Sequence, residues 1–425
     1  MNGFAKLLVF GMVCLSLQGQ GVIPPIAHLS RQDAVKEALA HNPSITAARE
    51  QVAEAKAGIA IATAIPDPSL VTEIDQERNF FNPGSGTEKD IGVQFTVPNP
   101  YRTHLNGRIA RGGWLVAQFA LTQLRQQIAS QTAQAYDAVQ VAVRHRDDLS
   151  ESKRIAQQFL DKSQKRYQAG TVPKLDTIKA KVNLAQAEND LIANERTIAV
   201  AESGLNHLLG RVLGVTLEEI DPLDIPGAVP EPNALEQMAA ASRPELRSMT
   251  AQRKAAHDST KVAKQYWAPD VNLTLWHSDI EGAPDSYKFD GGITFPLFFW
   301  QHEKGAVSQA VHHEKELEST EHDLFSQVML DVHNSYTTAT IAWRQAIFIR
   351  DELLPEAREA FDTTFTSYGL GGSSAMDLLD AKSTLVAAES EYTDALGAVN
   401  DAAANLERAA GAPLPPATNG ISHEK

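Results

Sequence analysis

The chain has 425 residues and a formal net charge of −15, because 53 Asp and Glu outnumber 38 Lys and Arg. Nucleic-acid binding needs clustered positive charge, so this balance argues against a nucleic-acid partner. Cys14 is the only cysteine, and the chain therefore has no disulfide framework.

Residues 1–21 have the layout of a secretory signal peptide. Lys6 precedes an apolar run over residues 7–17, and small residues then suit cleavage before Val22. The run is too short to span a bilayer, and no other stretch is long and apolar enough for a transmembrane helix. A lipid anchor at Cys14 remains an alternative.

Two helices and two strands are predicted next. Helices are expected over residues 30–40 and 43–64, because Ser30 can cap the first and a proline suits the first turn of the second. Strands are expected over residues 69–77 and 90–97. In the second, apolar and polar side chains alternate with the period of a half-buried strand.

A long helix is expected over residues 103–167, broken only at Gly107 and Gly112-Gly113 near its start. At a rise of 1.5 Å per residue it would be roughly 95–100 Å long. Gly170 then reverses the chain into a returning helix over residues 173–209. This helix and helix 43–64, stacked end to end, could run beside the long one.

The order then repeats after a linker rich in proline and glycine at residues 212–232. The second half predicts, in order, a helix over 244–266, strands around 271–276 and 287–297, a long helix over 303–367 kinked at Pro355, a final helix ending at Gly411, and a tail at 412–425.

The two halves, 22–211 and 233–411, are a tandem duplication. Matching residues keep a constant offset of 201, among them Tyr167 and Tyr368, Gly170 and Gly371, Asp176 and Asp377. The helix after each turn also carries an apolar seam in alternating steps of three and four, beginning Leu184, Ala187, Leu191 and Leu385, Ala388, Tyr392. A strict heptad predicts a left-handed coiled coil, with an ordinary helical bundle as the alternative.

The four strands have the length of transmembrane β-strands, roughly nine to eleven residues. Ile91, Val93, Phe95 and Val97 share one apolar face. Four strands cannot close a barrel and lipid does not tolerate open edges, so membrane-spanning strands require several chains to share one barrel. Three chains would give twelve strands. The alternative is a small soluble sheet on a helical stalk.

Nearly all of the mature chain resembles the TolC-type outer-membrane efflux family. The resemblance rests on both strand pairs and on specific motifs: Asn42-Pro43, Arg243-Pro244, Tyr167-Gln-Ala-Gly-Thr-Val, Tyr368-Gly-Leu-Gly and Met376-Asp377. It implies a mainly α fold with membrane β: a long antiparallel α-helical coiled-coil barrel, plus four β-strands per chain in a shared twelve-stranded trimeric β-barrel.

The same resemblance implies a passive exit duct in the outer membrane that extends into the periplasm. Its partners would be two further copies of the chain, a periplasmic adaptor protein, an inner-membrane pump and outer-membrane lipid. The second turn, residues 371–374, has no basic residue where some family members carry an arginine that helps to lock the closed state.

Two groups of site residues follow from the resemblance. A periplasmic constriction would be lined by Asp176, Asp377 and Asp380. The adaptor would dock on the turns, at Tyr167, Gly170, Thr171, Val172, Tyr368, Gly369, Leu370 and Gly371. The alternative for the aspartates is structural, because an acid just after a turn also suits the start of a helix.

No enzyme and no cofactor are expected. The sequence lacks a phosphate-binding loop, a His-Glu-x-x-His motif and a Gly-x-Ser-x-Gly motif. The histidines of the second long helix lie too far apart to share one metal ion and are expected on the solvated surface. The alternative function is a periplasmic coiled-coil adaptor or structural stalk protein.

Overall fold

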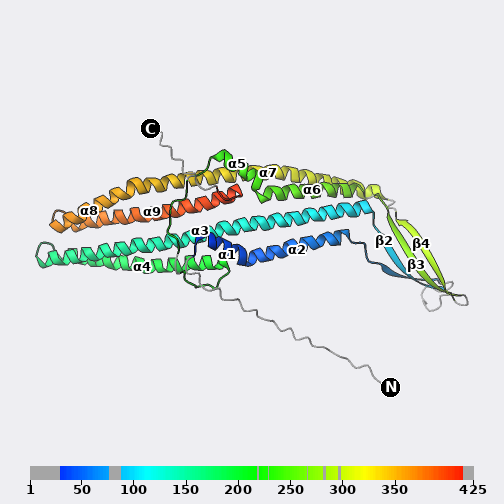
Figure 1. The fold of residues 1–425 in the computed structure, drawn as a ribbon, viewed down its shortest axis with the longest axis horizontal. Helices are drawn as coiled ribbons and strands as arrows, with labels where there is room; N and C mark the ends of the chain where they lie inside the picture. Colours follow the sequence, from blue (N-terminus) through cyan, green and yellow to red (C-terminus); the bar gives the residue numbers. More distant parts are fainter. Residues whose placement is uncertain are drawn as a thin grey trace, which may run out of the picture.

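The computed structural model describes residues 29–75, 88–217, 220–227, 229–265, 267–280, 284–294 and 298–414. The predicted signal peptide, Cys14 and most of the predicted tail lie outside these residues. Long helices run along the whole molecule, with the sheet at one end and two tight turns at the other (Figure 1).

The described helices are α1 Arg31–His41, α2 Pro43–Thr63, α3 Pro100–Gln168, α4 Lys174–Leu209, α5 Pro232–Ser242, α6 Pro244–Lys264, α7 Phe299–Phe348, α8 Leu354–Leu370 and α9 Ala375–Ala410. The strands are β1 Ser69–Asp75, β2 Glu88–Val97, β3 Asp270–Ile280 and β4 Ser286–Thr294. No helix in the described part of the chain has the length and apolarity needed to cross a membrane.

Helix α5 was not predicted, although the repeat contains the signal for it. Its first and last residues, Pro232 and Ser242, lie 201 positions after those of α1. The proline-rich composition before it favoured a linker, but a proline at the first helical position is compatible with a helix. Both halves therefore begin with a short helix that leads into a longer one.

Helix α3 runs unbroken for 69 residues, so the predicted breaks at its glycines are wrong. The glycines serve close packing instead. A Cβ at Gly107 would lie 2.6 Å from the methyl group of Thr63 on α2, and one at Gly112 would lie 2.8 Å from Ala255 on α6. Both shorter helices can therefore approach α3 closely.

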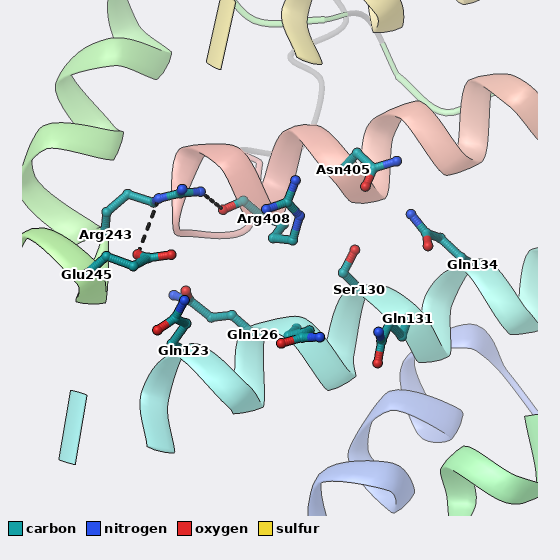
Figure 2. Close-up of a pocket in the computed structure, with 10 residues that line it drawn as sticks. Gln123, Gln126, Ser130, Gln131, Gln134, Arg243, Glu245, Asn405 and Arg408 are labelled. Carbon is teal, nitrogen blue, oxygen red and sulfur yellow. Dashed lines mark hydrogen bonds and ion pairs between the residues drawn. The ribbon is translucent and has the colours of Figure 1, made fainter. Parts of the chain in front are cut away.

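Each returning helix meets a shorter helix end to end. The amide of Asn42, at the start of α2, donates to the Leu208 carbonyl near the end of α4 at 2.9 Å. At the matching place in the second half, Arg243 donates to the Arg408 carbonyl at 3.1 Å (Figure 2). It also donates to the Ala409 carbonyl at 3.4 Å. These bonds satisfy carbonyls that a helix end leaves unpaired.

Near Pro355 the second long helix changes its hydrogen-bond pattern without ending. Residues Ile349–Leu353 form one turn of π-helix between α7 and α8. Proline has no backbone N–H to donate, and its ring would clash with the carbonyl four residues earlier in a regular α-helix. The wider turn is a common way to absorb such a disruption.

The long helices form one layer, in the order α7–α8, then α9 with α6, then α3, then α4 with α2 (Figure 1). Helix α3 lies between α4 and α9 and so joins the two halves. The predicted seam is confirmed, because its residues on α4 and α9 are all buried or half-buried. Leu205 and Leu406, at matching places in the two seams, are fully buried.

The four strands form one antiparallel sheet in the order β1-β2-β3-β4. The predicted apolar face of β2 is confirmed: Ile91, Val93, Phe95 and Val97 are 38–54% exposed. Phe289 on β4 is 68% exposed. One face of the sheet is therefore mainly apolar and uncovered in a single chain.

The opposite face of the sheet is polar and hydrogen-bonded across the strands. Thr96 on β2 donates to Asn272 on β3 at 2.9 Å, and the Asn272 amide donates to Thr294 on β4 at 2.7 Å. Further along the strands, the indole N–H of Trp276 donates to Asp290 at 2.6 Å. The two faces thus differ sharply in polarity.

Candidate functional site

The turn between α3 and α4 has the geometry that its glycine predicts. Gly170 has a φ of +73°. The N–H of Thr171 donates to the Arg166 carbonyl at 3.0 Å, and the N–H of Gly170 donates to the Tyr167 carbonyl at 2.9 Å. This pair of bonds is a Schellman motif, which closes a helix and requires a left-handed residue.

The turn between α8 and α9 repeats this motif at the same offset. Gly371 has a φ of +91°. The N–H of Gly372 donates to the Ser367 carbonyl at 2.9 Å, and that of Gly371 to the Tyr368 carbonyl at 3.2 Å. Side chains with a Cβ disfavour this conformation, so both turns depend on their glycine.

The helices that leave the two turns begin differently. Helix α9 starts with a capping box: Ser374 accepts from the N–H of Asp377 at 3.2 Å, and Asp377 accepts from the N–H of Ser374 at 2.9 Å. The backbone hydrogen bond from Ser374 lowers the pKa of the Asp377 carboxyl. At the matching place before α4 stands Pro173, whose side chain makes no cap.

The three predicted constriction residues lie within the first two turns of the returning helices: Asp176 and Asp377 in the first turn, and Asp380 in the second turn of α9. Asp377 and Asp380 are exposed and lie three residues apart on α9, hence on one face of that helix. Asp176 is half-buried on α4. The structural role considered for these residues holds for Asp377, which caps its own helix.

The predicted docking residues divide into exposed and supporting positions. Tyr167 and Leu370 are 44% and 87% exposed. Gly170, Thr171, Gly369 and Gly371 are exposed as well, and Val172 is half-buried. Tyr368 is instead fully buried, with its ring edge-on to Phe159 at 5.4 Å between centroids. Tyr368 therefore anchors the α8 end against α3.

Two cations on α3 also tie the turns together, and the sequence analysis missed both. Arg166 donates to the Tyr368 carbonyl at 2.6 Å and lies over the Tyr368 ring at 4.7 Å. Lys162 lies 3.4 Å from the centroid of the Phe365 ring, and burial lowers its pKa. The basic residue that contacts the second turn is therefore supplied by the first hairpin.

The spacing of Lys162 and Arg166 was the available signal, because residues four apart share one face of a helix. That face of α3 meets α8 in a cluster that includes Phe159, Phe361 and Tyr368. The two hairpins of one chain are therefore held side by side at their ends by aromatic packing and by cation–aromatic contacts.

The described residues contain no group of three or more His, Cys, Asp or Glu side chains arranged to hold a metal ion. Several histidines instead have carboxylate neighbours. His257 lies 2.8 Å from Glu314, and His313 lies 3.2 Å from Glu316.

Comparison with known proteins decides the family. The family model described as outer membrane efflux protein matches residues 34–211 and 235–412. The chain belongs to the outer membrane efflux protein family. Its two matched segments correspond to the two halves of the duplication.

One curated relative is the cobalt-zinc-cadmium resistance protein CzcC of Cupriavidus metallidurans, 24% identical over 394 residues and 90% of each chain. Among solved structures, CusC matches with a TM-score of 0.76 and 18% identity, covering 90% of this chain and 92% of CusC. VceC of Vibrio cholerae matches with a TM-score of 0.75 and 16% identity, covering 91% and 97%.

This efflux protein is thus a non-enzymatic duct of the outer membrane that extends into the periplasm. Its fold is that of the TolC-like channels, with a helical barrel and strands for a shared β-barrel. The adaptor and stalk alternatives are not favoured, because the family match spans both strand pairs and both turns.

Proposed function

We propose that three copies of the chain close into one duct, with the α4 edge of each copy against the α7–α8 edge of the next. The observation that carries this proposal is the pair of apolar edges on the helical layer. On α4, Ile178, Val182 and Ile192 are 48%, 60% and 66% exposed, on the face that points away from α3.

The opposite edge of the layer also exposes apolar side chains. On α7, Leu330, Ile341 and Phe348 are 58%, 57% and 61% exposed, on the face directed away from α9. Two apolar stripes at opposite edges of one layer suit a head-to-tail ring, in which each interface pairs one stripe with the other.

The strands support the same closure. β1 and β4 are the two edges of the sheet, and an unpaired strand edge is not tolerated in lipid. Pairing β1 of one copy with β4 of the next removes all edges and gives twelve strands from three copies. The exposed apolar face would then contact outer-membrane lipid and the polar face would line the channel.

Cross-linking tests the ring directly. Ile192 and Phe348 lie at about the same height, since a chain of cross-layer contacts joins Asn194 on α4 to α3, α3 to α9, and α9 to α7. A chain carrying both Ile192→Cys and Phe348→Cys should form cross-linked dimers and trimers in detergent, and no larger species.

The matched control pairs Ile192→Cys with Leu330→Cys, which lies 18 residues, or roughly 27 Å, further along α7 from Phe348. It should give no cross-linked product. If it cross-links as well as the first pair, or if the native mass in detergent is that of a single chain, the ring is disproved.

At the closed periplasmic end, Asp176, Asp377 and Asp380 of three copies would form rings of carboxylates. Like charges that lie close together resist ionisation, and a bound cation relieves the repulsion. The constriction would therefore prefer cations. The exposed turn residues, Leu370 foremost, would dock a periplasmic adaptor that links the duct to an inner-membrane pump.

We infer that divalent metal cations are among the cargo. The support is the whole-length similarity to the cobalt-zinc-cadmium resistance protein CzcC and the carboxylates at the constriction. Deletion of the gene should raise intracellular zinc, cobalt or cadmium in cells exposed to these metals. Unchanged accumulation of all three would contradict the metal assignment.

Recordings in a planar bilayer test the constriction. The closed channel should conduct weakly, prefer cations and be blocked by divalent cations added from the periplasmic side. The double change Asp377→Asn with Asp380→Asn should remove the block. Because Asp377 also caps α9, the control is Ser374→Ala, which removes the cap and keeps the charge. If Ser374→Ala abolishes the block equally, the aspartates act only through the helix start.

A further inference from the structure

A hollow of about 830 Å³ lies along α3, midway between the turns and the sheet, where α4 and α9 rise on either side. Its floor is Ala138, Val141 and Ala142 of α3. The size falls within the range of sites for drug-sized molecules, which are mainly apolar with a few polar groups.

Small residues line this hollow. Gly397 on α9 marks where that helix packs closely on α3, since a Cβ there would lie 2.7 Å from a methyl group of Val141. Ala201 on α4 and Ala398 on α9 line the walls. The central helix is therefore recessed between its neighbours, with apolar atoms at the bottom.

Acidic groups lie along the α9 wall. Asp394 is 2.9 Å from His145 across the hollow's edge. Asp401, two helical turns away, has no hydrogen-bond or ion-pair partner among the described residues. Partial burial, and repulsion from Asp137 that outweighs attraction to Arg31, raise the pKa of Asp401 to about 6. Its negative charge is uncompensated at neutral pH.

The opposite wall carries one cation, Arg196 on α4. A positively charged ligand would therefore orient with its charge toward α9 and its apolar part on the α3 floor. Because Asp137 is paired with Arg31 at 2.9 Å and Asp394 lies 2.9 Å from His145, the acidic group left to meet a ligand first is Asp401 on α9.

The hollow faces away from α1. Tyr136 and Val139 of α3 pack in the cluster that contains α1 residues, whereas Ala138 and Val141 point to the other face of α3. A layer whose central helix is recessed is concave on that face. When such a layer closes into a ring, as proposed above, its concave face lines the channel.

We propose that this hollow is a binding site for amphiphilic organic cations on the wall of the channel. The ligand's apolar body would lie on the alanine and valine floor and its charge beside Asp401 and Asp394. This assigns the duct a second class of cargo, beyond the metal cations inferred from its relative.

The neighbouring hollow along the same seam provides a contrast. It measures about 280 Å³ and is lined by amides and arginines, among them Gln131, Gln134, Asn405 and Arg408 (Figure 2). It has neither the apolar floor nor an unpaired carboxylate. The only carboxylate in its lining, Glu245, lies 3.3 Å from Arg243. The change from an acidic lining to one with two arginines marks where binding of such a cation should stop.

Equilibrium dialysis of the purified full-length protein in detergent, corrected with protein-free detergent, tests the proposal. The probes are tetraphenylphosphonium and tetraphenylborate, which match in size and shape and differ in charge. The phosphonium should bind and the borate should not. Asp401→Asn should weaken phosphonium binding roughly fivefold, the effect of losing one partly exposed charge pair.

Three further variants distinguish binding in the hollow from a general effect of surface charge. Ala138→Trp fills the floor and should abolish binding. Glu391→Gln removes one exposed charge from α9 outside the hollow and should change nothing. Arg196→Gln should strengthen binding of the cation. Equal binding of both probes, equal effects of Asp401→Asn and Glu391→Gln, or weaker binding after Arg196→Gln would each overturn the proposal.

The floor on α3 and the acidic wall on α9 belong to one chain, and neither lies on the α4 edge that the ring would cover. Binding of the phosphonium is therefore expected whether or not three copies form a ring, and the cross-linking test reports the ring separately. If the cross-link fails but the phosphonium binds, the binding site stands and its position on the channel wall is disproved. If the ring forms but the phosphonium does not bind, the duct stands and the binding site is disproved.

Discussion

Lys382 gives the most direct test of how the two hairpins are joined. It stands on α9, only 6% exposed, and its ammonium donates to Asn183 on α4 at 2.8 Å. The contact crosses the layer past α3. Burial lowers the pKa of Lys382 from 10.5 to about 8, although Asp190 attracts its charge.

The free-energy cost of burying the charged Lys382 side chain follows from that pKa. One pKa unit corresponds to 1.36 kcal/mol, so a change from 10.5 to about 8 disfavours the charged form by about 3 kcal/mol. Residual water contact and the lost bond to Asn183 both reduce the gain from removing the charge. We therefore expect Lys382→Met to raise the free energy of unfolding by about 1–2 kcal/mol near pH 7.

The direction in which stability changes with pH follows from the linkage between protonation of Lys382 and folding. Between about 8 and 10.5 the unfolded chain binds the proton and the folded chain releases it, so the wild-type stability should rise with pH across this window. The advantage of Lys382→Met is full below about pH 8. It disappears within this window and reverses by about pH 10.5, because the wild type regains about 3 kcal/mol, more than the net advantage of the variant.

Denaturant unfolding followed by helical circular dichroism, at several pH values, measures this change. The matched control is Lys181→Met, at the equivalent place on α4, where the side chain is exposed. It should leave the stability and its pH dependence unchanged. If Lys382→Met is instead less stable than wild type near neutral pH, the link to Asn183 outweighs the burial of charge, and the reasoning fails.

Three further substitutions test other elements. A Cβ at Gly92 would lie 2.6 Å from the indole of Trp276, so Gly92→Ala should destabilise the sheet by about 1–3 kcal/mol. The variant should lower the temperature at which the assembly dissociates, and adding Trp276→Ala should restore that temperature. Gly371→Val, at a φ of +91°, should abolish export and leave assembly intact, because Leu330, Ile341 and Phe348 on the apolar α7 edge all lie well before the turn in the helix; loss of assembly would show that the turn is only structural. Ile192→Glu places a charge on the apolar edge of α4 and should yield monomer by native mass measurement, whereas an intact trimer would move the interface elsewhere.

Much of the fold could be read from the sequence because the duplication supplied two copies of each signal. Apolar periodicity predicted the strands and the seams, and glycine predicted both turns. Helix α5 was missed although the offset from α1 placed it, because the prolines before it suggested a linker. The α3 glycines were misread as breaks, since a single sequence does not show that Thr63 and Ala255 pack against them.

The site was predicted less completely, because it depends on contacts between hairpins far apart in the sequence. Tyr167 and Tyr368 are equivalent in the repeat, yet one is exposed and the other fully buried. Nothing in the repeat distinguishes them. The difference comes from the partner: Tyr368 meets Phe159 and Arg166 of the other hairpin.

Helix α4 meets α2 end to end at Asn42, and α9 meets α6 end to end at Arg243. The length of the periplasmic tube therefore depends on all of these helices together with the long helices beside them. Removing seven residues from α4 alone would draw its turn back by about 10 Å while α3 kept its full reach. The hairpin could not close, and its seam would face the wrong partners. The span that the duct bridges can therefore change in evolution only by matched insertions or deletions in both arms of both hairpins.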